Sequence, residues 1–346
     1  MGIEIGKMSL REMERQMSLI ETSVEELVSS EHEYRRMLGI LDFGELTRPL
    51  GKLYSELGRG GYPIEQGFRC LLLQFLEDLS DRELERFLQE NLAGKYFCGF
   101  ELKTRTPDFS YFSRLRSRIG TERLAGLYNR VRESLKVSGI IREVFTFVDA
   151  SQLLSRVNVW EARDRALADR QNEEKDEEGN RKLNNRNVGK YSSDGEARFG
   201  CKGKEKFWFG YKRHVSVDMS AGLINQVVVT PANVPDHRGL TGVCPDGGMV
   251  FADKAYCVRE AQATLSARGC HSGVILKKNM KGKDFDKDRW LSSVRMPFES
   301  VFARLSKRAR YRGTVKNQFQ ALMQSLVFNF KRLIKIVAAP IPLIAV

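Results

Sequence analysis

The chain has 346 residues, of which 42% are hydrophobic and 10% aromatic, so it can bury a large core and has room for two domains of unequal size. Its 57 Lys and Arg against 44 Asp and Glu give a formal net charge of +13, which favours a polyanionic partner such as nucleic acid or a membrane surface. No apolar stretch reaches the roughly 18 to 20 residues that span a bilayer, which weakens the membrane option and leaves nucleic acid as the better partner.

The cysteine content indicates the cellular compartment in which the protein resides. The six cysteines are widely scattered without a C-x-x-C pair, and only four histidines accompany them. This pattern excludes a zinc site and a secreted disulfide framework. The chain also lacks the charged and apolar regions of a signal peptide at its start. We therefore expect a cytoplasmic protein, in a reducing environment, whose positive charge favours association with nucleic acid.

The first 140 residues have the pattern of helices. Residues 64–79 carry apolar side chains at helical spacing after Pro63, and Ser80 with Glu83 forms a capping box that opens a second helix over residues 81–91. A third helix is predicted from Pro107, with the proline at its first position. Residues 1–140 are therefore predicted to form a helical N-terminal domain that binds DNA ends, dimerises, or does both.

Arginines at alternate positions mark the third helix. Arg114 and Arg116, with Arg118 beyond them, are predicted to contact DNA. A solvated helix face is the equally good alternative, because runs of charge usually face water.

From residue 144 the residue pattern changes to that of β-strands. Residues 207–218 and 223–230 form a predicted hairpin, and residues 258–268 have helical propensity. The pattern predicts an α/β domain over residues 141–335, with a mixed sheet flanked by helices, followed by an apolar tail at 336–346. The other predicted strands are 144–149, 249–253 and 273–278.

A polar insertion interrupts the predicted sheet at about residues 160–206. It is rich in Arg, Asp, Glu, Asn and Lys and has few apolar residues before Phe199. Because so few apolar side chains are available for burial, we expect a long mobile insertion in the free protein, which could become ordered on nucleic acid.

Three acids stand at comparable places in the predicted sheet. Asp149 ends the first predicted strand, Asp253 ends the fourth, and Glu299 lies on the last amphipathic region after the fifth. If the first and fourth strands are neighbours, the two aspartates meet and a helix packed on them can present the glutamate. Three carboxylates arranged in this way suit two Mg²⁺ ions, with Mn²⁺ as a substitute, for in-line displacement at phosphorus.

Each acid alone has a structural alternative. Asp149 could cap the turn after its strand, Asp253 could cap the next helix, and Glu299 could complement a helix dipole after Pro297. The combination of the three at these positions is what favours a metal site.

Basic residues surround these acids. Lys254 follows Asp253 directly, and cations without an intervening acid follow Glu299. Such a segment is predicted to bind backbone phosphates beside the site, with a solvated helix face as the alternative. The predicted DNA contacts here are Lys254, Arg295, Arg304, Lys307, Arg308, Arg310, Tyr311 and Arg312.

The second predicted strand carries further cations, Lys212 and Arg213, followed by His214. They could face DNA, or the strand could simply alternate its two faces with His214 hydrogen-bonded inside. Asp236 and His237, in the loop after the hairpin, could form a turn, with Asp236 as a possible extra carboxylate near the site.

The chain resembles the DDE transposases of bacterial insertion sequences, specifically the insertion-sequence-five group within the insertion-sequence-four-like superfamily. The resemblance covers most of the chain. Its segments are residues 80–100, 106–120, 148–151 (VDAS), 209–218, 229–240, 252–256 (ADKAY) and 298–318.

This resemblance implies a ribonuclease-H-like core and an oligomer that binds the terminal inverted repeats of its own element and a target DNA. Asp149, Asp253 and Glu299 match the family's metal-binding triad, and Arg295 and Lys307 match basic residues that hold terminal DNA. The implied activity is strand cleavage followed by strand transfer. Two alternatives stay open, a ribonuclease-H-like nuclease that does not join strands and a catalytically inactive end-binding protein or repressor.

Overall fold

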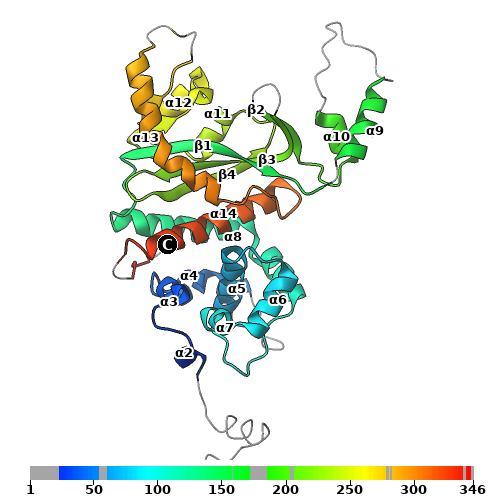
Figure 1. Ribbon diagram of the computed structural model, residues 1–346, viewed down its shortest axis with the longest axis vertical. Coiled ribbons are helices and arrows are strands. Elements are labelled where there is room, and N and C mark those ends of the chain that lie inside the picture. Colours follow the sequence, from blue (N-terminus) through cyan, green and yellow to red (C-terminus); the bar gives the residue numbers. More distant parts are fainter. Residues whose placement is uncertain are drawn as a thin grey trace, which may run out of the picture.

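The structure is a computed structural model that describes residues 23–53, 61–157, 159–171, 185–202, 206–277, 280, 283–337 and 340–343. A mixed sheet with its flanking helices occupies one end of the elongated molecule, and a group of helices occupies the other (Figure 1). None of the described helices combines the length and apolar character that crossing a membrane requires.

The N-terminal part is helical, as predicted, and its helices pack around one buried core. α6 begins at the predicted capping box, in which Glu83 N is 3.3 Å from Ser80 Oγ and Ser80 N is 2.8 Å from Glu83 Oε2. Its helices are α2 (Val24–Leu27), α3 (Glu33–Leu38), α4 (Phe43–Thr47), η1 (Arg48–Leu53), α5 (Ile64–Leu76), α6 (Asp81–Glu90), α7 (Leu92–Cys98) and α8 (Phe109–Val137).

The start of α8 differs from the prediction. Asp108 is the cap, and its Oδ1 accepts hydrogen bonds from the backbone N–H groups of Ser110 and Tyr111. Pro107 therefore lies outside the helix, because an aspartate satisfies the free N–H groups of the first turn, which a proline cannot do. α8 bends at Gly120, whose φ of 69° lies in the left-handed region.

The sheet has six strands, and its order and directions are ribonuclease-H-like. Five run in the order β4, β3, β1, β5, β6; β1 is antiparallel to β3 and parallel to β5, and β2 also pairs with β3. The first and fourth predicted strands are thus neighbours. The strands are β1 (Phe145–Leu154), β2 (Arg198–Lys202), β3 (Lys206–Asp218), β4 (Leu223–Pro231), β5 (Met249–Ala252) and β6 (His271–Val274).

Three of the predictions for this region need correction. β1 continues to Leu154 because β3 pairs with it along that length, so Asp149 lies within the strand and neither ends it nor caps a turn after it. β6 begins at His271 and ends at Val274 rather than spanning 273–278, because its partner β5 ends at Ala252 and offers no further backbone to pair with. The insertion is partly ordered: it contains α9 (Trp160–Gln171), α10 (Asn185–Tyr191) and β2, and the last of these gains its order by pairing with β3. Residues 172–184 lie outside the described part of the chain.

Helices cover both faces of the sheet. On one face, α13 (Phe285–Arg304) lies across β1 and β5, and α14 (Thr314–Leu333) packs against β4. On the other face, residues of β1 and β5 pack with the short helices that follow them. These are α11 (Asp236–Gly239), η2 (Leu240–Gly242), η3 (Lys254–Tyr256) and α12 (Arg259–Ala267).

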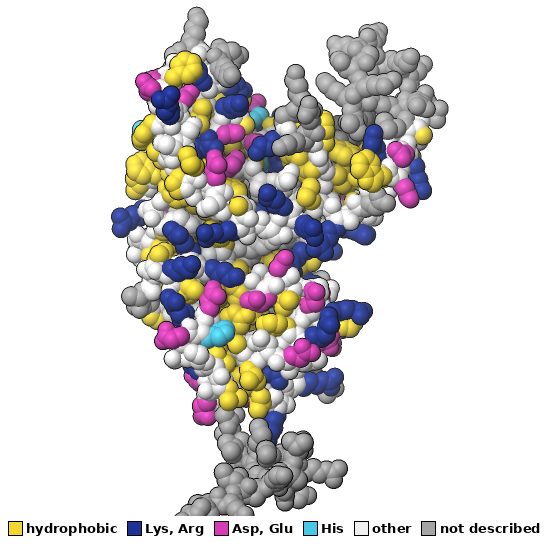
Figure 2. Space-filling view, viewed as in Figure 1, with side chains coloured by type: hydrophobic (Ala, Val, Ile, Leu, Met, Phe, Trp, Pro, Cys, Tyr) yellow, Lys and Arg dark blue, Asp and Glu magenta, His cyan; other side chains and the backbone are white. Residues whose placement is uncertain are grey.

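α14 also contacts α5 and α8, so it lies between the sheet and the N-terminal helices (Figure 1). Lys and Arg side chains form a band across the middle of the molecule, over α14 and the loop that precedes it (Figure 2). In the apolar tail, Ile341 is buried and its N–H donates to the carbonyl oxygen of Ile40, so this part of the tail packs against the N-terminal helical region.

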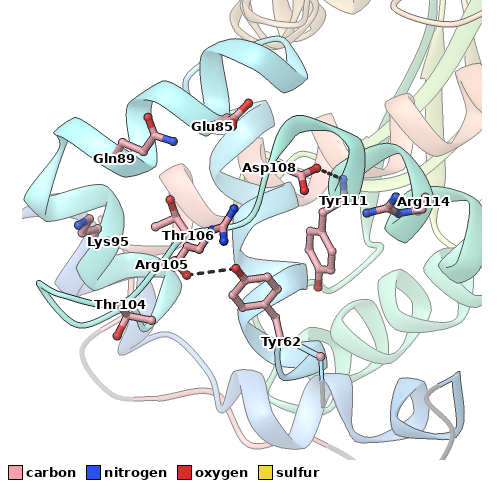
Figure 3. Close-up of a pocket in the computed structure, with 11 residues that line it drawn as sticks. Tyr62, Glu85, Gln89, Lys95, Thr104, Arg105, Thr106, Asp108, Tyr111 and Arg114 are labelled. Carbon is pink, nitrogen blue, oxygen red and sulfur yellow. Dashed lines mark hydrogen bonds between the residues drawn. The ribbon is translucent and has the colours of Figure 1, made fainter. Parts of the chain in front are cut away.

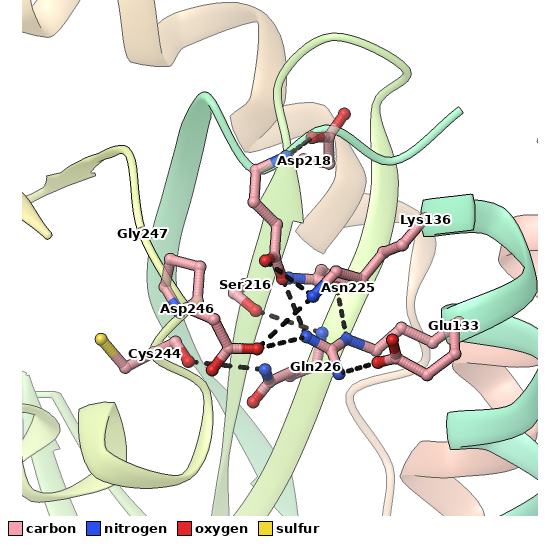
Figure 4. Close-up of polar contacts among 12 residues, drawn as sticks. Glu133, Lys136, Ser216, Asp218, Asn225, Gln226, Cys244, Asp246 and Gly247 are labelled. Atoms are coloured by element: carbon pink, nitrogen blue, oxygen red, sulfur yellow. Dashed lines mark hydrogen bonds and ion pairs between the residues drawn. The ribbon is translucent and has the colours of Figure 1, made fainter. Parts of the chain in front are cut away.

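A polar cluster fastens α8 to the end of the sheet (Figure 4). Arg132 on α8 donates to Asn225 on β4 at 2.7 Å and to Glu143 at 2.8 Å, and Lys136 pairs with Glu143 at 3.0 Å. Asp218 accepts the backbone N–H of Glu143 at 3.0 Å, which fixes the entry into β1. The first strand of the site is therefore held in place from its N-terminal end.

Candidate active site

Asp149 and Asp253 lie side by side on neighbouring parallel strands. Phe147 pairs with Phe251 in the register of β1 and β5, and each aspartate follows its phenylalanine by two residues. Side chains two apart on a strand share a face. Both carboxylates therefore lie on the face that α13 covers, at the same level of the sheet.

Each aspartate also accepts a hydrogen bond from nearby backbone. Asp149 Oδ1 accepts the N–H of Ala150 at 2.8 Å, and Asp253 Oδ1 accepts the N–H of Ala255 at 2.8 Å as the cap of η3. The capping interpretation of Asp253 is thus correct, but it uses one oxygen only. Among the described residues the Oδ2 atoms of both aspartates have no hydrogen bond.

The electrostatics of this pair disfavour two negative charges. Burial raises the pKa of the Asp149 carboxyl to about 6, and the nearby carboxylate of Asp253 adds to the rise. The hydrogen bond from Ala150 and the cationic side chains of Arg295 and Lys202 oppose it. Two neighbouring carboxylates that repel each other are stabilised by a cation between them.

Arg295, on α13, stands next to this pair rather than on an open surface. Its side chain is 10% exposed, and its guanidinium lies 5.3 Å from the centre of the Phe147 ring. Its Nε is buried and has no hydrogen-bond partner among the described residues. Arg295 is therefore positioned to act on Asp149, and its side chain is too buried to form part of an exposed DNA-binding surface.

Glu299 lies one turn further along α13. Its side chain is 58% exposed, and its Oε1 is 3.6 Å from Nη2 of Arg295. In the described part of the chain, no three His, Cys, Asp or Glu side chains come close enough together to hold one metal ion. The structure therefore brings two of the three predicted acids together and leaves the third on the covering helix, held by Arg295.

The donor set fits a hard divalent cation. Mg²⁺ is commonly bound by one or two carboxylates, with water and substrate phosphate completing its six ligands. Asp149 and Asp253 supply two such carboxylates, with an oxygen of each outside any hydrogen bond.

Sequence reasoning missed Tyr256, which lies under the two aspartates. It is fully buried, and its hydroxyl has no hydrogen-bond partner among the residues that the structure describes. Burial raises its pKa well above the usual range, and the carboxylates of Asp149, Asp236 and Asp253 act in the same direction. The signal that could have found it is its spacing, since it follows Asp253 by three residues.

Asp236, the possible extra carboxylate, lies on α11, on the face of the sheet opposite α13, and it is already paired. Its Oδ1 is 2.7 Å from Nζ of Lys212, which also donates to the carbonyl oxygen of Val234. His214 is fully buried and bonds Thr230 Oγ1 at 2.9 Å, and burial lowers its pKa to about 4. His237, at 2.6 Å from a carboxylate oxygen of Glu260, belongs to α11 rather than to an isolated turn.

Several predicted DNA contacts are buried or paired within the protein, which corrects their assignment. Arg213 is fully buried and donates to Gln324 on α14 at 2.8 Å, because β3 is central and covered on both faces. Lys212 is tied to Asp236. Arg116, Arg310 and Tyr311 form an internal cluster: Arg116 pairs with Asp81 at 2.6 Å and lies over the Tyr311 ring, and Arg310 pairs with Asp78.

The other predicted contacts are exposed. Most lie on the C-terminal end of α13 and in the loop before α14, where the basic band of Figure 2 is found. The exposed residues are Arg114, Lys254, Arg304, Lys307, Arg308 and Arg312, and Lys316 at the start of α14 joins them. The surface at the C-terminal end of α13 and along the loop that follows it is therefore basic.

Comparison with known families gives two matches. A model described as "Transposase domain (DUF772)" matches residues 22–118, and a model described as "Transposase DDE domain" matches residues 186–330. Asp253 and Glu299 lie inside the second match, and Asp149 lies before it.

Among solved structures, the chain matches the "Mos1 transposase paired-end complex with left transposon end". The match covers 82% of this chain and 81% of that chain, at 9% identity and a TM-score of 0.18. At this score the two structures do not superpose closely, and the match places no residue of the site.

Proposed function

The chain belongs to the DDE transposases of the insertion-sequence-five and insertion-sequence-four-like type, and from this premise we propose that it cuts and joins DNA at the terminal inverted repeats of its own mobile element. The observation that carries the proposal is the pair of Asp149 and Asp253, level with each other on β1 and β5. The raised pKa of Asp149 supports it, since a site that charge repulsion destabilises gains most from a bound cation.

Asp149 and Asp253 would hold Mg²⁺, for which Mn²⁺ could substitute. The bound metal would activate the attacking oxygen and stabilise the leaving oxygen of an in-line displacement at phosphorus. Water is the nucleophile for cleavage, and the freed 3′-hydroxyl is the nucleophile for joining, so no side chain becomes bonded to DNA. A terminal phosphate reaches the acids along the basic surface formed by Arg304, Lys307 and its neighbours.

Glu299 completes the triad by leaving Arg295 and turning toward the aspartates. Because Glu299 is exposed and the two charged groups are 3.6 Å apart, breaking this ion pair costs little free energy. Once Glu299 has left it, Arg295 contacts a DNA phosphate next to the aspartate pair. DNA binding and assembly of the triad are coupled in this scheme.

The protein works on two element ends at once, so the active form is a homodimer or a larger homo-oligomer on DNA. The N-terminal helices supply end binding or the contact between copies.

The test is cleavage and joining of labelled DNA that carries the element's terminal repeats, with Mg²⁺, with Ca²⁺ and with chelator. Asp149→Asn, Asp253→Asn and Glu299→Gln should each abolish product and keep DNA binding, because binding rests on Lys and Arg. Asp286→Asn, an exposed acid at the start of α13, is the matched control and should stay active.

Two outcomes would replace the proposal. Cleaved DNA without joined product in any metal would mean a nuclease. Binding of the repeats with no cleavage under any condition would mean an end-binding protein or repressor, and the separation of Glu299 from the aspartates would then be its permanent state.

A further inference from the structure

A pocket of about 590 Å³ lies in the N-terminal helical region, away from the aspartate pair (Figure 3). Its walls come from α6, from the loop between α7 and α8, and from the first turns of α8, with Tyr62 on the remaining side. The volume is that of a site for a small molecule or a single residue of a polymer. A double helix is too wide to enter it.

Aromatic side chains form part of the wall. The rings of Tyr62 and Tyr111 meet edge to face, with centres 5.3 Å apart and planes at 72°. The Tyr62 hydroxyl donates to the carbonyl oxygen of Arg105 at 3.1 Å, which ties the loop to the ring. A Cβ atom at position 67 would lie 2.5 Å from the Tyr111 hydroxyl, so the Tyr111 ring can occupy this position only because residue 67 is glycine.

The acids of the pocket are already used by the backbone. Asp108 Oδ1 caps α8, and Glu85 Oε2 accepts the N–H of Phe109 at 3.2 Å. Arg105 and Arg114 are exposed, and neither forms an ion pair with any residue that the structure describes. With Lys95, which donates to the carbonyl oxygen of Leu102, they outnumber the two carboxylates of the pocket and give it a net positive charge.

The pocket thus combines three kinds of group. Its aromatic rings suit the flat face of a base, the side-chain amide of Gln89 suits the edge of a base, and two arginines suit a phosphate. A nucleotide presents all three partners at once, and in a duplex the face and much of the edge of its base are hidden.

We propose that this pocket takes one unpaired nucleotide at a DNA end. The inference rests on the proposed function, because a protein that cuts and joins ends meets DNA with frayed or unpaired nucleotides. Its consequence is a preference for open ends over fully paired duplex, set by the N-terminal region and independent of the metal site.

The test compares two duplexes that differ only in one extrahelical 2-aminopurine nucleotide at the end, with chelator present so that no cleavage occurs. Wild type should bind the open duplex about fivefold to a hundredfold more tightly, the range that stacking of one base on an aromatic ring gives. The 2-aminopurine fluorescence should fall as the base stacks.

Arg105→Ala and Lys103→Ala form a matched pair of variants. Both residues are exposed on the same loop and carry the same charge, but only Arg105 lines the pocket. Both changes should weaken general binding alike, and only Arg105→Ala should remove the preference for the open duplex. Gln89→Ala should reduce that preference without changing binding of the paired duplex.

If wild type bound the two duplexes equally, the assignment of the pocket as a nucleotide site would be wrong, and the proposed function would be unaffected. Equal loss of the preference in both charge variants would overturn it as well, since charge alone would explain the result. Free deoxyadenosine monophosphate competing as well as the open duplex would overturn the assignment to DNA. Failure to bind either duplex would overturn the proposed function itself.

Discussion

Replacing Asp149 with asparagine should stabilise the metal-free protein at neutral and alkaline pH. Burial raises the pKa of this carboxyl from its ordinary 3.8 to about 6. The folded state therefore disfavours the charged form, and the unfolded state does not. Asparagine has nearly the same shape and carries no charge, so Asp149→Asn removes the cost and keeps the packing.

The size of the effect follows from the pKa change. At 1.36 kcal/mol per pH unit, a rise from 3.8 to about 6 costs the folded wild type about 3 kcal/mol once the pH is above both values. Because the folded pKa is the higher one, the folded protein is unpenalised below the unfolded pKa and loses stability as the pH rises through 6. At pH 4 the cost should be only about 0.5 kcal/mol.

The assay is urea unfolding of wild type and Asp149→Asn at pH 4 and pH 8 with chelator. The variant should be the more stable by about 3 kcal/mol at pH 8 and nearly equal at pH 4. Added Mg²⁺ should raise the stability of wild type and not that of the variant. The reasoning, and with it the electrostatic basis of the metal site, would be refuted if the variant were less stable than wild type at pH 8. It would also be refuted if their difference in free energy of unfolding were the same at both pH values.

Four further changes test the surrounding structure. Tyr256→Phe removes a buried hydroxyl that has no partner among the described residues, so urea unfolding should show no loss, or a gain of about 1 kcal/mol; a clear loss would reveal a partner. Arg116→Ala breaks the ion pair with Asp81, which is partly exposed, and should lower the free energy of unfolding in urea by about 2 kcal/mol. At no salt concentration should the variant unfold at a higher urea concentration than wild type. Gly210→Ala would place a Cβ 2.2 Å from a backbone oxygen of β1 at a φ of 150°, so it should cost about 3 kcal/mol or more or prevent soluble expression, whereas Gly126→Ala, with open space around it in α8, should gain up to about 1 kcal/mol in thermal unfolding.

The sequence predicted well what depends on local pattern. Alternation and β-branched content located β3 and β4, and the capping box located the start of α6. The meeting of Asp149 and Asp253 needed one further condition, that their strands be neighbours, and the sheet meets it.

What it could not predict depends on partners far along the chain. Arg213 reads as a DNA contact by its charge, but its main partner, Gln324, is 111 residues away on α14. Arg116 is held by Asp81 on another helix in the same way. The position of Glu299 is set by how α13 lies on the sheet, which its spacing from Pro297 does not define.

The placement of α14 determines when the fold can be completed during synthesis. This helix ends at Leu333 and is the layer on which both the sheet and the N-terminal helices pack. A ribosome releases it after every other described helix and strand. Until then β4 lacks its cover, and Arg213 lacks the amide of Gln324 that satisfies it. The nascent chain can therefore form its N-terminal helices early, but the face of the sheet that α14 covers is completed only after that helix has been synthesised.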